Sequence, residues 1–316
     1  MNSVSALSSA PVAESAGVPA AAPLDQWMRT CQDRFEALAQ ASLPPAGRQP
    51  QRLHCAMRYA VLDGGKRIRP LLAYAAGELA QADWAALDAV ALALEYVHAY
   101  SLVHDDMPCM DNDVLRRGKP TVHVAFDQAT AMLAGDALQA EAFRILADAP
   151  LPAAARLELI QDLAAASGTE GMCGGQAIDL DALGKTLDAR QIEQMHRMKT
   201  GALLRASVLM GARAGHLDPP VLGQLGRYAE AIGLAFQIVD DILDVESSSA
   251  EMGKTVGKDQ AQNKSTYVSV LGMAAAKQRA AQLRDVAGLA LEQTGLGPVR
   301  TMRMAQLADL IVARRN

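Results

Sequence analysis

From residue 25 onward the sequence is dominated by residues that favour helices, and this restricts the fold more than any other feature. Ala, Leu, Gln, Glu and Arg recur throughout, and aromatic residues make up only 4% of the chain. Runs in which apolar and polar residues alternate, as in half-buried strands, are missing from the sequence. Segments of helical length end at turn-forming stretches such as "SLPPAG", "DGGKRIRP", "DAPLP" and "GHLDPP". These segments predict roughly ten helices of ordinary length.

The chain shows no repeat of fixed period, no sustained heptad pattern and no linker. We therefore expect one all-α domain over residues 25–316, a large helical bundle with a central active-site cavity among its inward-facing side chains. Residues 1–24 are rich in Ala, Pro and Ser, and they predict a flexible tail. They lack the basic start and the continuous apolar core of a secretory signal.

Charge and cysteine content exclude several classes of protein. Lys and Arg number 30 against 35 Asp and Glu, which gives a formal net charge of -5. Because nucleic-acid binding needs a basic footprint, this balance argues against such a partner. The four cysteines form neither a CxxC pair nor a regular framework, which argues against structural zinc and a disulfide scaffold; they are Cys31, Cys55, Cys109 and Cys173. A reducing cytoplasm is the location that fits best.

The longest apolar run covers residues 84–103, "WAALDAVALALEYVHAYSLV". It contains Asp88, Glu95 and His98, which argue against a membrane span, so we expect no stable membrane insertion. The run predicts a buried helix instead.

Two groups of aspartates lie far apart in the sequence. The first, in "SLVHDDMPCMDNDVLRRG", contains Asp105, Asp106, Asp111 and Asp113. In the second, "GLAFQIVDDILDVESS", Asp240 and Asp244 share one helix face with Gln237. Either group alone fits a solvated helix end, yet both adjoin apolar runs in which carboxylates are costly without cations. We therefore expect the two groups to face each other and to share divalent metal ions, of which Mg²⁺ prefers oxygen ligands.

Basic residues occur in sets beside these acids. Each set alone is compatible with a solvated loop, but their joint placement predicts the binding of a diphosphate. In "DGGKRIRP" three cations converge on the start of a helix at Pro70. The sets comprise Lys66, Arg67 and Arg69; Arg116 and Arg117; Lys199; and Lys254, Lys258 and Lys264.

These motifs together resemble a known family. The stretches "LVHDDMPCMDNDVLRRGKPT", "GLAFQIVDDILD", "DGGKRIRP", "GMCGGQAIDLD" and "KTGALLRA" are similar to those of the trans-isoprenyl diphosphate synthases, in their bacterial farnesyl diphosphate synthase branch. The match runs from about residue 60 to the C-terminus. It implies an all-α bundle of the isoprenoid synthase type, a homodimer, and three magnesium ions that hold an allylic diphosphate between the two aspartate motifs.

The resemblance also implies a role for individual residues. Asp105 and Asp111 would bind two magnesium ions with support from Asp106, and Asp240 would bind the third. Arg116 would hold the allylic diphosphate together with Lys199, Lys254 and Lys264, and Lys66, Arg69, His98 and Arg117 would hold isopentenyl diphosphate. Thr200 and Gln237 would line the region where positive charge develops, and Gly174, Gly175 and Gln176 would permit close helix packing. His98 taken alone is equally compatible with a satisfied core histidine.

The implied reaction joins isopentenyl diphosphate head to tail with dimethylallyl or geranyl diphosphate to give farnesyl diphosphate. Metal ions and basic side chains would neutralise the leaving diphosphate, so that the allylic carbon–oxygen bond breaks and leaves a carbocation. No enzyme nucleophile is required, and the sequence shows no evident Ser/His/Asp or Cys/His constellation.

Product length would be set just before the first aspartate. Ser101 precedes Asp105 by one helical turn and Tyr100 lies beside Ser101. In the family a bulky ring five residues before the first aspartate blocks the growing chain, so Tyr100 favours a farnesyl product. An aromatic ring that merely packs in the core is the alternative for Tyr100.

Three rival functions share parts of this pattern. A geranylgeranyl diphosphate synthase uses the same chemistry, and the "PC" insertion in "DDMPCMD" also occurs in that branch. A terpene cyclase has no use for Lys66, Arg69 and Arg117, and its second motif is not found here. A catalytically silent prenyltransferase subunit would be expected to have lost metal or phosphate ligands, whereas both aspartate groups and all matched cations are present.

Overall fold

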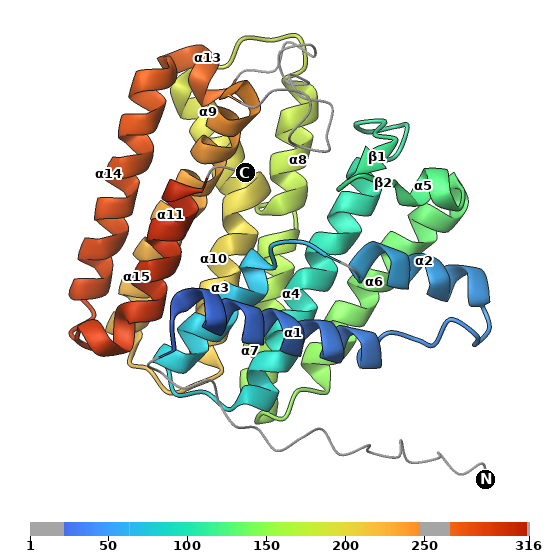
Figure 1. Ribbon diagram of the computed structural model, residues 1–316, viewed down its shortest axis with the longest axis horizontal. Helices are drawn as coiled ribbons and strands as arrows, with labels where there is room; N and C mark the ends of the chain where they lie inside the picture. Colours follow the sequence, from blue (N-terminus) through green and yellow to red (C-terminus); the bar gives the residue numbers. More distant parts are fainter. Residues whose placement is uncertain (1–21, 63, 247–265, 315–316) are drawn as a thin grey trace.

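Helices make up nearly all the regular structure of the computed structural model, which describes residues 22–62, 64–246 and 266–314 (Figure 1). The all-α fold predicted from the sequence is confirmed. Most of the proposed N-terminal tail lies outside the described residues, and the first helix begins at Leu24. In chain order the elements are α1 (Leu24–Ser42), α2 (Gln51–Val61), α3 (Ile68–Leu79), α4 (Trp84–Asp105), β1 (Leu115–Arg116), β2 (Lys119–Pro120), α5 (Val122–Ala125), α6 (Gln128–Ala147), α7 (Ala153–Ser167), α8 (Met172–Asp181), α9 (Ala189–His196), η1 (Arg197–Gly201), α10 (Ala202–Arg213), α11 (Pro219–Glu246), α13 (Tyr267–Leu271), α14 (Met273–Glu292) and α15 (Pro298–Ala313).

Two local features depart from the sequence prediction. Short helices such as α5 and α13 bring the number of helices above the expected ten, because they join the longer helices instead of belonging to them. A two-stranded antiparallel hairpin, β1–β2, pairs Leu115 with Pro120. Its turn is formed by Arg117 and Gly118, both of which have positive φ, as tight hairpin turns require.

The long apolar helix α4 runs through the centre of the bundle, between α6 on one side and α3 and α10 on the other (Figure 1). Asp83 caps its first turn by accepting a hydrogen bond from the backbone N–H of Ala85. Although α4 is long and apolar enough to cross a membrane, 83% of its most apolar window is buried inside the protein. The prediction that residues 84–103 form a buried helix is therefore confirmed.

Asp88 of α4 is buried beside an arginine from another helix. Arg34 of α1 donates two hydrogen bonds to the carboxylate of Asp88, at 2.7 and 2.6 Å. The hydroxyl of Tyr74 on α3 donates a third, at 2.9 Å. These bonds compensate the charge that made residues 84–103 a poor membrane span, and they join three helices across the core.

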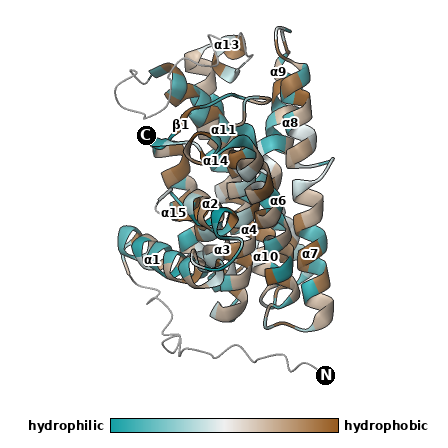
Figure 2. Cartoon of the chain, turned by 90° about the vertical axis from the view of Figure 1, so that its right-hand side faces the viewer, coloured by the Kyte–Doolittle hydropathy of each residue, from teal (hydrophilic) through white to brown (hydrophobic). Residues whose placement is uncertain are grey.

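Small residues allow the central helices to approach closely. Gly211 of α10 packs so tightly on α3 that a Cβ there would overlap the carbonyl oxygen of Ala73. The other side of α10 contacts α11, which in turn packs on α14. Both α4 and α11 end at the upper side of the bundle in Figure 1, while outer helices such as α1 present hydrophilic residues to solvent (Figure 2).

We expect Gly211→Ala to lower the free energy of unfolding by about 1–3 kcal/mol, because the added methyl group must push α3 and α10 apart. Gly223→Ala is the matched control, since Gly223 is a helical glycine of α11 with open space around it. That substitution should raise stability by about 0.5–1 kcal/mol through helix propensity. Urea denaturation followed by circular dichroism measures both effects, and equal shifts of the two midpoints would contradict the packing argument.

Candidate active site

The first aspartate group lies where α4 ends. The chain folds back after Asp105, because the backbone N–H of Asp111 donates to the carbonyl oxygen of Asp105 at 2.8 Å. Burial raises the pKa of Asp105 to about 6, and the negative charges of Asp111 and Asp106 act in the same direction, while Lys199 and Arg116 oppose them. A carboxylate in such surroundings gains from any cation that approaches it.

Asp106 already has a protein partner. Arg116 on β1 donates hydrogen bonds to both carboxylate oxygens of Asp106, at 2.9, 2.8 and 2.6 Å. The Asp106 side chain is 4% exposed and that of Arg116 is 21% exposed, so the guanidinium remains accessible from one side. The β1–β2 hairpin therefore places a cation directly beside the end of α4.

A second group of cations surrounds His98 of α4. Burial lowers the pKa of His98 well below its usual value, and the positive charges of Arg69, Arg117 and Arg116 lower it further. Arg69 has a buried Nε with no hydrogen-bond partner among the described residues. Arg117 donates to the carbonyl oxygen of Gly64 at 2.7 Å. Cations packed this closely around a neutral histidine suit an anionic ligand.

Arg67 does not belong to this group, although the sequence places it between Lys66 and Arg69. It is buried, and its guanidinium donates to Glu95 at 2.9 Å and to Glu36 at 2.8 Å. Its backbone φ of 51° is unusual for a residue other than glycine, and these bonds hold it there. The structure therefore removes Arg67 from the diphosphate cradle predicted from "DGGKRIRP". Lys66, in contrast, is exposed.

The π-helical turn η1 carries Lys199 and Thr200. Lys199 donates to Asp179 of α8 at 2.6 Å. A Cβ on Gly175 would overlap the backbone nitrogen of Lys199, so the predicted packing role of this glycine is confirmed. Asp179 was missed as a site residue, although it lies in the same "GMCGGQAIDLD" motif. π-helical turns are rare in proteins, but those that occur are often found at functional sites.

Thr200 connects η1 to α11. Its hydroxyl donates to Oε1 of Gln237 at 3.0 Å, and Nε2 of Gln237 donates to Asp241 at 3.0 Å. Asp241 also accepts a hydrogen bond from the backbone N–H of Tyr267, at 2.8 Å. The buried Asp241 thus orients its neighbours, a role that the sequence pattern did not reveal.

The second aspartate group is engaged by the end of the chain. Arg314, just after α15, forms an ion pair with Asp240 at 2.8 Å, and its guanidinium stacks 3.8 Å from the centre of the Phe236 ring. The Arg314 side chain is 9% exposed and that of Asp240 is 43% exposed. No motif at the C-terminus pointed to Arg314, because this contact depends on how α15 packs on α11.

Tyr100 and Ser101 differ in their surroundings. Tyr100 is buried, its ring packs edge-on to His104, and its hydroxyl lies 3.8 Å from the sulfur of Cys173 on α8. The hydroxyl of Ser101 donates to the carbonyl oxygen of His98 within α4. Cys173 is exposed and was not expected beside the residue proposed to set product length.

The structure brings most of the predicted residues to one end of the bundle. Lys199 acts electrostatically on Asp105 of α4, and Thr200, next in the chain, bonds to Gln237 on α11, three residues before Asp240. The negative charge of Asp240 acts on Arg69, which in turn acts on His98. Lys254 and Lys264 lie outside the described residues.

Carboxylate oxygens are the ligands that Mg²⁺ prefers, so Asp105, Asp111 and Asp240 fit this ion chemically. Among the described residues no three His, Cys, Asp or Glu side chains lie close enough to hold a metal on their own. An ion at these carboxylates would need further ligands, such as water and phosphate oxygens.

Ion pairs of carboxylates with cations thus gather at one end of an all-α bundle. The polyprenyl synthetase family matches residues 50–295, and the chain belongs to that family. It is 51% identical over 264 residues to the farnesyl diphosphate synthase of Escherichia coli strain K12, covering 82% of this chain and 88% of the relative.

Two solved structures are also similar. An apo FPP/GFPP synthase from Zymomonas mobilis has a TM-score of 0.83 and 43% identity, covering 92% of this chain and 99% of its own. A geranyltransferase from Helicobacter pylori, complexed with magnesium and isoprenyl diphosphate, has a TM-score of 0.81 and 33% identity, covering 92% and 97% of the two chains.

We expect Arg67→Met to lower the free energy of unfolding by about 3–5 kcal/mol, since it leaves the buried Glu95 without its cation. Lys66→Met, the neighbouring change on an exposed side chain, should alter stability by less than about 0.5 kcal/mol. The double variant Arg67→Met/Glu95→Gln should recover part of the loss. Urea denaturation of the three variants measures these values, and a stable Arg67→Met protein would show that the ion pair is dispensable.

Proposed function

We propose that the protein is a prenyltransferase that condenses isopentenyl diphosphate with dimethylallyl and then geranyl diphosphate, in the presence of magnesium, to give farnesyl diphosphate. The observation that carries this proposal is the set of ion pairs at one end of the bundle, Asp106–Arg116, Asp179–Lys199 and Asp240–Arg314. Two of these pairs offer a cation for diphosphate, Arg116 and Lys199, and the third contains Asp240, a carboxylate for metal. Membership of the polyprenyl synthetase family and the similarity to a farnesyl diphosphate synthase support the same reading. We place the enzyme in the cytoplasm, as the sequence predicts.

The basic residues would divide between two diphosphates. Arg116 and Lys199, with Lys254 and Lys264, would bind the allylic diphosphate and stabilise it as it leaves. Arg69, whose buried Nε lacks a partner among the described residues, would bind isopentenyl diphosphate with Lys66, His98 and Arg117. The neutral form of His98 suits a hydrogen-bond donor held among arginines.

Thr200 and Gln237 would stabilise the allylic carbocation. The carboxylate of Asp241 only accepts hydrogen bonds, so Gln237 must turn its NH₂ group toward it and its Oε1 toward Thr200. The Thr200 hydroxyl then donates its proton to Gln237 and leaves an oxygen lone pair directed away from that bond. An oriented oxygen dipole of this kind stabilises a nearby positive charge by electrostatics and forms no bond to the carbocation.

Magnesium would be held by Asp105 and Asp111 on one side and by Asp240 on the other, with Asp106 in support; we expect three ions, as the resemblance implies. When bound, the ions would neutralise diphosphate oxygens as charge develops on them. Burial raises the pKa of Asp105 to about 6, and a nearby cation would favour its charged form.

A farnesyl product is favoured over a geranylgeranyl product by Tyr100. The ring is 6% exposed and is held between His104 and Cys173, so it occupies fixed space five residues before the proposed metal ligand Asp105. The 51% identity to a farnesyl diphosphate synthase supports the same product.

Self-association as a homodimer is supported by an exposed apolar surface formed by β1, α5 and α6. Large apolar side chains that are 41–59% exposed gather there, namely Val114, Leu115, Val124, Met132 and Leu133. The three elements lie side by side on the right of Figure 1. Exposed apolar surface of this kind marks interaction sites in soluble proteins, and a second copy of the chain is the partner we propose.

Incubation of the purified protein with isopentenyl diphosphate, geranyl diphosphate and Mg²⁺ should yield farnesyl diphosphate, and chelation of the metal should stop the reaction. Asp105→Ala should lower the turnover number about a thousandfold, because it removes a charge that the proposed metal needs. Asp285→Ala on the exposed face of α14 is the control and should leave the rate unchanged. Activity of Asp105→Ala close to that of the wild type would refute the metal assignment.

Tyr100→Ala should make products longer than farnesyl diphosphate the main products, because the space vacated by the ring admits further isoprene units. Tyr100→Phe keeps the ring and should keep the farnesyl product. Chromatography of the dephosphorylated products separates these chain lengths. An unchanged distribution for Tyr100→Ala would assign the ring to core packing alone.

A further inference from the structure

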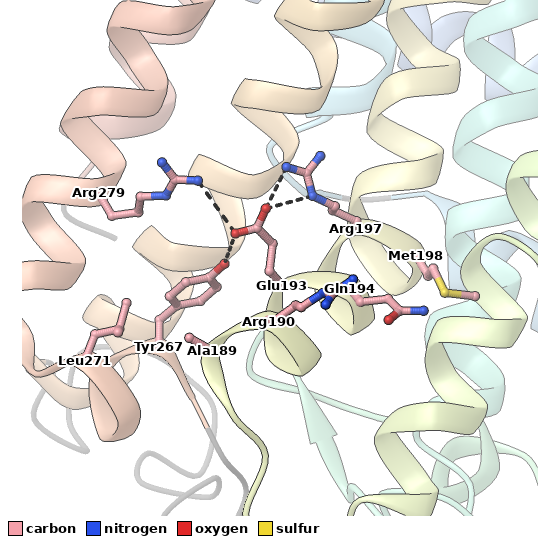
Figure 3. A pocket seen from close by; sticks show the side chains of 9 residues that line it. All are labelled: Ala189, Arg190, Glu193, Gln194, Arg197, Met198, Tyr267, Leu271 and Arg279. Carbon is pink, nitrogen blue, oxygen red and sulfur yellow. Dashed lines mark hydrogen bonds and ion pairs between the residues drawn. The ribbon is translucent and has the colours of Figure 1, made fainter.

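A cavity lies apart from the residues assigned to the substrates. It has a volume of about 760 Å³ and is formed by α9, η1, α13 and α14 (Figure 3). Three arginines belong to its lining: Arg190 of α9, Arg197 of η1 and Arg279 of α14. None of the residues that line it is a residue to which the resemblance gives a role. The cavity, here called the arginine pocket, therefore has no assigned ligand.

The charge of the arginine pocket is unbalanced. Among the described residues its one lining acid is Glu193, which accepts hydrogen bonds from Arg197 at 3.0 and 2.7 Å and from the hydroxyl of Tyr267 at 3.3 Å. Arg279 lies 3.6 Å from the same carboxylate, as an ion pair too long for a strong hydrogen bond (Figure 3). One carboxylate thus faces three guanidinium groups.

Arg190 lies in the same lining, and its side chain is exposed. The described residues provide it with no hydrogen bond and no ion pair. Guanidinium groups repel one another at short range, and each presents up to five donors in a planar fork that matches phosphate oxygens. An anion with two or more negative charges would balance the pocket and use the donors that Glu193 leaves open.

We propose that the arginine pocket binds a phosphate or diphosphate group. Arg190 and Arg279 would supply its main contacts, with the remaining donors of Arg197 and the side-chain amide of Gln194 beside them. Met198 and Leu271 add apolar surface to the same lining, so an organic group attached to the phosphate can also be accommodated. Inorganic diphosphate and an organic diphosphate ester share this chemistry.

The pocket adjoins the candidate active site without sharing its residues. Arg197 and Met198 of η1 line the pocket, while the next two residues, Lys199 and Thr200, bond to Asp179 and Gln237. The same turn therefore carries the contacts of both sites. A ligand in the pocket should slow backbone hydrogen exchange in η1 as well as in α9 and α13.

The test is hydrogen exchange with mass spectrometry, on the full chain with a chelator present so that no turnover occurs. Titration with inorganic diphosphate should protect peptides that cover residues 189–198 and 267–279. Arg190→Gln should raise the concentration needed for this protection about tenfold, the value of one charged hydrogen bond. Because Arg190 is exposed and has no hydrogen bond or ion pair with described residues, the variant should keep its fold, which circular dichroism checks.

Arg227→Gln is the matched control, since it removes one exposed positive charge from α11 and should leave the protection unchanged. Peptides around residues 101–118 report separately on diphosphate bound at the candidate active site. Protection at 101–118 alone, or equal protection at 189–198 in wild type and Arg190→Gln, would overturn the proposal. Since exchange measures binding and not turnover, this result is independent of the proposed reaction.

Geranyl diphosphate in the same titration separates the two sources of ligand. Protection of 189–198 at a concentration about tenfold lower than that of inorganic diphosphate would assign the site to an organic ester that uses Met198 and Leu271. Equal concentrations would assign it to the diphosphate group alone. If neither compound protects this segment, the pocket has no such ligand.

Discussion

Buried carboxylates need positive partners, and this requirement organises both the core and the candidate active site. In the core, Arg67 and Glu95 are 2% and 4% exposed, so protein groups enclose the pair on every side. At the end of the bundle the pairs are more open, since Arg116 and Lys199 remain 21% and 25% exposed. A closed pair can only stabilise one arrangement of helices. An open pair keeps its carboxylate compensated and still offers its cation to an anionic ligand.

The turn η1 gives one short segment two faces. A π-helical turn inserts an extra residue into a helix and rotates the residues that follow it. Lys199 and Thr200 reach α8 and α11, while the two residues before them, Arg197 and Met198, line the arginine pocket. Gly175 permits the close approach that this arrangement needs, because any side chain there would meet the backbone of Lys199. The site depends on one irregular turn and on one glycine that packs against it.

The sequence predicted the helical class and the central helix because both follow from local pattern, and it predicted the aspartate groups because motifs carry them. The sequence did not predict the side-chain contacts whose two partners come from distant segments of the chain. Arg67 stands between two candidate phosphate ligands, yet its side chain turns into the core toward Glu36 and Glu95. Arg314 reaches Asp240 only because α15 packs on α11. Asp241 looks like its neighbour Asp240 in sequence, and only the fold shows that it orients Gln237.

Charge balance also links the binding of the diphosphate to the binding of the divalent metal ion in the proposed reaction. Arg116 and Lys199 form ion pairs with Asp106 and Asp179, at 2.6 Å in each case. A diphosphate that took over the cations would leave the carboxylates uncompensated. A divalent ion at the proposed ligands Asp105 and Asp111 would bring positive charge back to these carboxylates. In the proposed reaction the diphosphate and the ion together keep the site balanced, because the ion compensates the negative charge that the diphosphate exposes. Their binding should therefore be mutually dependent, and that dependence follows from ion pairs that exist before either arrives.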